Sequence, residues 1–165
     1  MSPRVPLSAC YPRPKRRWAL PVRGAEQMLA ANPRIADGGF YVALTLGDGK
    51  RIEEALRESP DLAMKAGGPC HWEPLLYVCF SRFSTGTSRL AESMATAARV
   101  LLGYGADPDS SFISKDWPDH PHLSCVYAAG LNNNPALALA LLEAGAHPND
   151  GERSTIRPNT EIWPP

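Results

Sequence analysis

The sequence predicts an all-α fold in which about three and a half helix–turn–helix units stack side by side as a solenoid. Residues 101–109 and 141–149 carry nearly the same phrase, Leu-Leu-x-x-Gly-Ala-x-Pro followed by Asp or Asn, and residues 55–63 carry a fainter copy. A repeat at a spacing of tens of residues is typical of an array whose units bury their apolar faces only against their neighbours. Such an array favours a binding function over catalysis.

Charge and composition exclude several classes of protein. The chain holds 17 basic and 17 acidic residues, but residues 1–25 contain six basic residues and no acidic one. The remaining residues are therefore acidic, which argues against nucleic acid as the partner. No apolar run reaches the ~18 residues of a membrane span. The four cysteines form no CxxC pair and no export signal precedes them, so we expect reduced thiols in the cytoplasm.

Three regions differ in composition. Residues 1–22 hold five prolines and most of the basic cluster, so we expect a disordered arm, unless translation begins at Met28. Residues 23–150 hold the repeated units. Residues 151–165 contain three prolines and no helical period, and we expect an irregular tail.

The first units contain short helices that prolines end. Residues 23–36 and 50–63 align at one offset, and Pro33 and Pro60 each disfavour helical geometry in the preceding residue. Between them, residues 39–46 predict an apolar helix, which the glycines of residues 47–49 close.

The later units have clearer boundaries. A helix should begin at Glu73-Pro74, since proline suits the first helical turn, and a second should span residues 90–102 and end at glycines. Ser124 is a predicted N-cap for residues 125–131. Residues 132–134 form the next turn, and residues 135–144 the last helix.

These residues resemble the ankyrin-repeat family, whose pattern is roughly T-P-L-H-x-A-A, then L-L-x-x-G-A-D-V-N. Residues 73–79 and 124–129 match the first half, and residues 101–109 and 141–149 match the second. The resemblance covers about residues 25–150. It implies stacked helix pairs joined by hairpin-like loops, with a concave groove that binds another protein.

The chain departs from the family pattern in two ways. The histidine of TPLH is Leu76 or Tyr127 here, so its hydrogen bond between units must be replaced or lost. Extra residues near 81–93 and 110–123 lengthen the spacing between the two glycine turns. We expect residues 84–88 to form an exposed loop after a helix that extends through residues 79–83.

The residues that could bind zinc or act as nucleophiles are better explained as ordinary structural residues. Cysteine and histidine are zinc ligand types, but none here has finger-like spacing; the set is Cys70, His71, His120, His122 and Cys125. Cys79 and Cys125 fall on apolar helices, where a buried cysteine acts as a small hydrophobe. We therefore expect no metal, no cofactor and no catalytic residue.

We expect the function to be non-enzymatic protein binding through the groove. Large aromatic side chains are enriched at interface hot spots, and the candidates at loop tips and exposed first-helix positions are Trp72, Tyr77, Phe80, Trp117 and His122. Two alternatives remain: a regulatory subunit or inhibitor of a separately encoded enzyme, and a metal-binding or catalytic protein on the same scaffold.

Two further expectations concern packing. Leu101 and Leu141 should be among the most buried residues, between adjacent units. The last helix is apolar nearly all round, which predicts a further covered face. Either the tail covers it with Ile156 and Trp163, or the stack self-associates weakly through its C-terminal end, which is the expectation we favour.

Overall fold

The protein is mostly helical, with one two-stranded antiparallel sheet, in a computed structural model that describes residue 27 and residues 29–84, 89–113 and 122–148. The dominance of helix confirms the coarse part of the all-α expectation, and the small sheet is an addition to it. None of the helices in these ranges is long and apolar enough to cross a membrane. The principal elements are α2 (Phe40–Leu46), α3 (Gly49–Glu58), α4 (Pro74–Cys79), α5 (Arg89–Gly103), β1 (Ser111–Ile113), β2 (His122–Ser124), α6 (Cys125–Leu131) and α7 (Pro135–Glu143). Three short 3₁₀ helices accompany them, η2 (Pro33–Asp37), η3 (Pro60–Ala63) and η4 (Arg82–Ser84).

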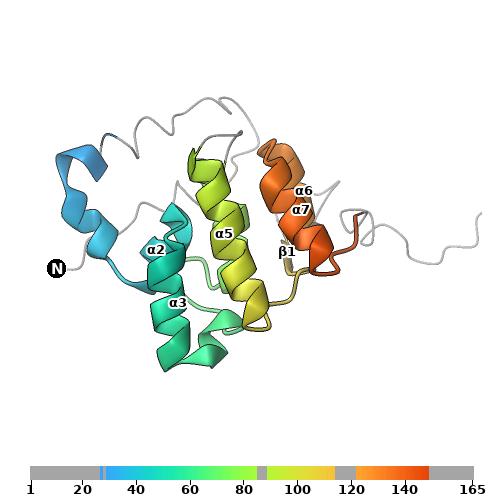
Figure 1. Ribbon diagram of the computed structural model, residues 1–165, viewed down its shortest axis with the longest axis horizontal. Helices are drawn as coiled ribbons and strands as arrows, with labels where there is room; N and C mark the ends of the chain where they lie inside the picture. Colours follow the sequence, from blue (N-terminus) through green and yellow to red (C-terminus); the bar gives the residue numbers. More distant parts are fainter. Residues whose placement is uncertain (1–26, 28, 85–88, 114–121, 149–165) are drawn as a thin grey trace, which may run out of the picture.

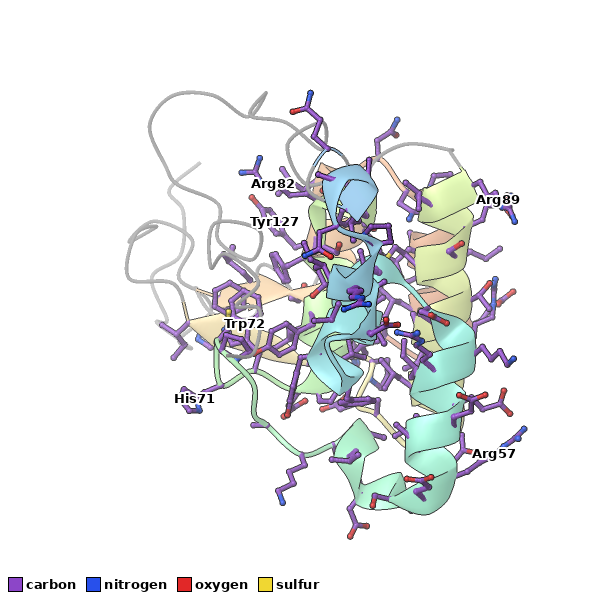
Figure 2. The ribbon with its side chains drawn as sticks, turned by 90° about the vertical axis from the view of Figure 1, so that its left-hand side faces the viewer. Arg57, His71, Trp72, Arg82, Arg89 and Tyr127 are labelled. Atoms are coloured by element: carbon purple, nitrogen blue, oxygen red, sulfur yellow. The ribbon has the colours of Figure 1, made fainter. Side chains whose placement is uncertain are left out.

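The long elements form three helix pairs in a row (Figure 1). We call α2–α3 unit one, α4–α5 unit two and α6–α7 unit three. The first helices, α2, α4 and α6, contact one another in sequence, and so do the second helices, α3, α5 and α7. The molecule therefore has two helical layers. Figure 2, turned by 90°, shows Arg57 and Arg89 projecting from the side of the second helices, opposite His71, Trp72, Arg82 and Tyr127.

In the described residues, side chains cap the starts of α3, α6 and α7, and the sequence predicted the cap at Ser124. The Ser124 hydroxyl accepts a hydrogen bond from the Tyr127 backbone N–H at 3.2 Å, and the Asn134 side chain accepts one from the Leu137 N–H at 3.0 Å. Asp48 does the same for Arg51 at the start of α3. Pro74 and Pro135 occupy the first turns of α4 and α7, where a missing N–H loses no helical bond.

The two matching phrases in the sequence form matching turns. Gly105 and Gly145 have φ values of 94° and 97°, a left-handed conformation that favours glycine. The Ala106 N–H donates to the Leu101 carbonyl at 3.1 Å, and the Ala146 N–H donates to the Leu141 carbonyl at 3.0 Å. Each is a Schellman turn, which uses helix carbonyls that would otherwise lack partners. The repeat seen in the sequence is therefore a repeat in backbone structure.

The predicted extension of α4 is wrong. The helix ends at Cys79, and residues 82–84 form the 3₁₀ helix η4, in which Phe83 and Ser84 are buried. Ser84 is buried because it has a partner inside the protein. The Asn134 amide donates a hydrogen bond to the Ser84 hydroxyl at 3.2 Å. The expected exposed loop therefore does not begin at Ser84, and residues 85–88 lie outside the described residues.

Side chains join each first helix to the next one. The Ser81 hydroxyl donates to the Thr45 carbonyl of α2 at 2.6 Å, and the Asn132 amide donates to the Cys79 carbonyl of α4 at 3.0 Å. Both donors stand eight residues after the N-cap of their own first helix. Two equivalent bonds therefore connect each first helix to the one that precedes it.

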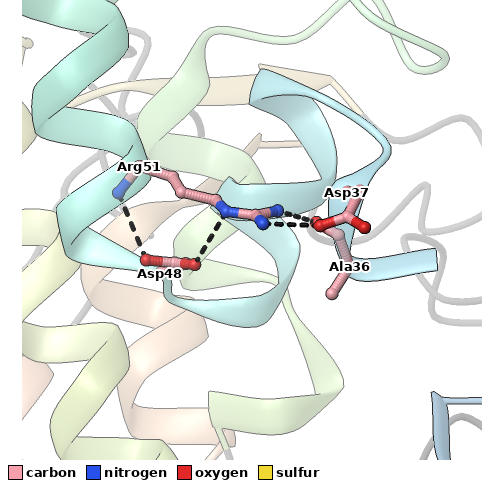
Figure 3. Close-up of polar contacts among 4 residues, drawn as sticks. All are labelled: Ala36, Asp37, Asp48 and Arg51. Carbon is pink, nitrogen blue, oxygen red and sulfur yellow. Dashed lines mark hydrogen bonds and ion pairs between the residues drawn. The ribbon is translucent and has the colours of Figure 1, made fainter. Parts of the chain in front are cut away.

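A surface arginine fixes η2 against unit one (Figure 3). Arg51 of α3 forms an ion pair with Asp37 at 2.6 Å and donates to the carbonyl oxygen of Ala36. It also lies 3.5 Å from Asp48, the N-cap of its own helix. Because the Arg51 and Asp37 side chains are both largely exposed, solvent screens this ion pair and its contribution to stability is small.

The core follows the expected pattern. Leu101 and Leu141 are fully buried, which confirms that prediction, and Leu44, Leu56 and Leu75 lie in the same core cluster. All five side chains belong to one continuous hydrophobic cluster that draws residues from all three units. Removing one should therefore leave a cavity.

Replacing Leu141 by alanine should lower the free energy of unfolding by about 2–5 kcal/mol, because the surrounding helices cannot close the cavity fully. Leu90 at the start of α5 is 38% exposed and provides the matched control. Urea unfolding of both variants checks the result. Equal losses for Leu141→Ala and Leu90→Ala would contradict the packing described above.

Candidate functional site

A tight turn and a two-stranded sheet lie on the side of the first helices. In the first, the Gly67 N–H donates to the Trp72 carbonyl at 3.0 Å, and Gly68 and His71 both have positive φ values. The second is the β1–β2 hairpin, in which Phe112 pairs with Leu123 and Ile113 pairs with His122. The first turn precedes α4 and the second precedes α6, so adjacent units present equivalent structures on one side.

Aromatic rings pack these two turns together. Trp72 of the first turn stacks on Phe112 of β1 with ring centroids 4.4 Å apart and an angle of 25° between the planes. Phe80, directly after α4, contacts both rings, at 5.8 Å from Trp72 and 5.0 Å from Phe112. We call Tyr41, Trp72, Tyr77, Phe80 and Phe112 the aromatic cluster. Its packing holds the turns of units two and three in a fixed relation.

Tyr77 fixes the first turn through its hydroxyl. That group donates to the Gly67 carbonyl at 2.7 Å and accepts a hydrogen bond from the Cys70 N–H at 2.8 Å. The Tyr41 ring lies 5.2 Å from the Tyr77 ring and packs against the turn's glycines. A Cβ at Gly68 would lie 2.6 Å from the Tyr41 ring. The close approach of this ring to the turn therefore requires glycine at position 68.

The exposure expected for the aromatic candidates is wrong. Trp72, Tyr77 and Phe80 are only 8%, 2% and 9% exposed. Their rings are covered because the turn of one unit packs on the turn and first helix of the next. Of the remaining candidates, His122 is half-buried in β2 and Trp117 lies outside the described residues.

The exposed apolar residue on this side is one that the sequence analysis missed. Ile113 of β1 is 66% exposed, whereas Phe112 beside it is half-buried in the aromatic cluster. Successive side chains of a strand point to opposite faces, so burial of Phe112 directs Ile113 outward. The β-branched and aromatic pair Phe112-Ile113 was the available signal for a strand.

The described cysteines do not form a reactive site. Cys79 and Cys125 are fully buried, and Cys70 is half-buried. Burial raises the pKa of the Cys125 thiol well above its ordinary value, and the neighbouring Cys79 and carboxylates act in the same direction. The Cys125 thiol is therefore kept protonated and unsuited to nucleophilic attack.

Potential metal ligands do not converge in the described part of the chain. No group of three or more His, Cys, Asp or Glu side chains there is placed to hold a metal ion. Cys70 donates its backbone N–H to Tyr77, and His122 belongs to the hairpin. His120 of the predicted ligand set lies outside the described residues.

Comparison with known proteins adds no relative: no family model matches the chain, and neither a curated protein nor a solved structure does.

Replacing Tyr77 by phenylalanine should lower the free energy of unfolding by about 1–3 kcal/mol, because the Gly67 carbonyl and the Cys70 N–H lose their common partner. Tyr104→Phe, at a half-buried tyrosine whose hydroxyl contacts the exposed Arg57, is the control and should change stability little. Thermal melts of both variants provide the measurement. If Tyr77→Phe matches wild type, the hydroxyl does not hold the turn.

Alkaline pH should destabilise the fold through Cys125. A thiol whose pKa is raised in the folded state contributes stability below its ordinary pKa of about 8.5 and loses it as the pH rises above that value. Burial also raises the pKa of Tyr41 and Tyr127, so these phenols stay protonated in the same range.

Urea unfolding at pH 7, 8.5 and 9.5 measures this effect. We expect stability to fall by up to about 1.4 kcal/mol per pH unit in the upper part of the range. Cys125→Ala should reduce the change in unfolding free energy with pH, whereas Cys70→Ala should leave this pH dependence unchanged. A wild-type slope retained in Cys125→Ala would exclude this thiol as the cause.

Proposed function

We propose that this chain is a non-enzymatic protein-interaction module of the ankyrin-repeat type. Support for the repeat type comes from the order of helix contacts, the matching turns at Gly105 and Gly145, and the two equivalent bonds between first helices. In such a stack each unit is held by its neighbours, so the surface loops are presented in fixed positions.

The observation that carries the proposed function is Ile113. A β-branched apolar side chain that is 66% exposed stands on a hairpin whose other face is anchored by Phe112 on Trp72. A side chain held on a rigid support loses little conformational freedom when a partner covers it, which favours affinity. The partner surface would be an apolar pocket or patch on another protein.

The use of buried polar groups supports a scaffold role. Each buried polar side chain of the described residues makes a hydrogen bond to the protein itself; these side chains are Thr45, Ser81, Ser84, Ser110, Ser124 and Asn134. Most of these bonds cap helices or connect units. A hydroxyl or amide committed in this way supports the fold rather than a reaction.

The proposal is tested by capture of a partner from an extract of the native host. Immobilised full chain, Ile113→Glu and Met64→Glu are compared by quantitative mass spectrometry. Met64 is 56% exposed but lies after η3, away from the hairpin, so it is the matched control. We expect one protein to be recovered by wild type and by Met64→Glu and to be lost, by about tenfold or more, with Ile113→Glu.

Equal recovery of every protein by all three baits would contradict binding through the hairpin. The identity of the captured protein separates the two interaction functions. If it is an enzyme whose rate changes when the full chain is added, the chain is a regulatory subunit or inhibitor.

A further inference from the structure

The face of unit three that points away from unit two is apolar. Leu139 and Leu142 of α7 are 52% and 42% exposed, and Leu131 at the end of α6 is 41% exposed. Leu139 and Leu142 are three residues apart on one helix, so they share a side. Figure 1 places α6 and α7 at the end of the row opposite α2 and α3. We call Leu131, Leu139 and Leu142 the end face.

Equivalent positions in unit two are directed toward the following unit. Aligning the Leu-Leu pairs of α5 and α7 matches Leu139 with Arg99 and Leu142 with Leu102. Arg99 approaches Glu143 of α7 at 3.9 Å, so that position faces the next unit. Leu131 matches Phe80, which is covered by the hairpin of unit three. The end face therefore stands where a further layer would pack.

A second copy of the chain is a poor fit to this face. With a rise of 1.5 Å per residue, α7 is only about 14 Å long and α6 is shorter. Two such helices about 10 Å apart offer roughly 300 Å², well below the ~800 Å² per partner of a stable interface. A short segment could cover this area, but a stable dimer would need additional surface.

The chain itself supplies a suitable segment. Residues 149–165 follow the Gly145-Ala146 turn, and the corresponding Gly105-Ala106 turn in unit two leads directly to β1 and the hairpin beside the next first helix. This segment carries Ile156, Ile162 and Trp163. Seven residues at about 3.3 Å each reach roughly 23 Å, enough to bring Ile156 to any point along α7.

We propose that residues 151–165 cover the end face, with Ile156 and Trp163 packed on Leu139 and Leu142. Tethering favours this arrangement over a second copy, because the effective concentration of an attached segment reaches the millimolar range. The segment would serve as the covering layer that a stacked array needs at its end. It would also leave the hairpin side free for a partner.

The test uses the full chain and three variants of it, with urea unfolding and sedimentation velocity as readouts. The tail variant is Ile156→Ser with Trp163→Ser, the face variant is Leu142→Asp, and the third combines both. Thr155→Ala with Thr160→Ala is the matched control in the same segment. We expect wild type and the control to be monomers of equal stability.

We expect the tail variant to raise the unfolding equilibrium constant about tenfold or more and to self-associate as concentration rises. The combined variant should be little less stable than either variant alone, because the tail change and the face change both remove the same contact. Three results would overturn the proposal: a wild-type dimer that Leu142→Asp dissociates, a tail variant identical to wild type, or losses that add fully in the combined variant.

Discussion

The structure depends on the burial of α4 in the centre of the stack. Every residue from Pro74 to Cys79 is buried, because α2 and α6 flank this helix and α5 covers it. Six residues are too few to form a stable helix alone, so α4 exists through packing rather than propensity. Units one and three both pack on unit two. This packing also fixes the positions of Trp72 in the turn before α4 and of Ile113 in β1.

Polar contacts set the register between units once α4 is packed. The bonds from Ser81 and Asn132 each reach the end of the preceding first helix, where carbonyls lack helical partners. On the opposite edge, Asp109 accepts from the His147 N–H at 2.7 Å and so connects the two Gly-Ala turns. A shift of one unit along its neighbour would break all of these bonds, and buried groups would lose partners.

The sequence predicted those elements whose signals are local. Ser124 and Pro135 mark helix starts through their own chemistry, and Gly105 and Gly145 mark turns through a backbone conformation that favours glycine. The site was not predictable in the same way. Burial of Trp72, Tyr77 and Phe80 depends on which turn lies beside them in space, and a short strand such as β1 takes its direction from Phe112 packing on Trp72.

Native-state hydrogen exchange of wild type and Leu101→Ala tests the central claim, that unit two holds units one and three in place. Leu101 lies on α5, which contacts both α3 and α7. The account predicts that the slowest amides of α3 and α7 lose protection together with those of α5, by a similar factor. Wild-type protection retained in α3 or α7, with loss confined to α5, would contradict it.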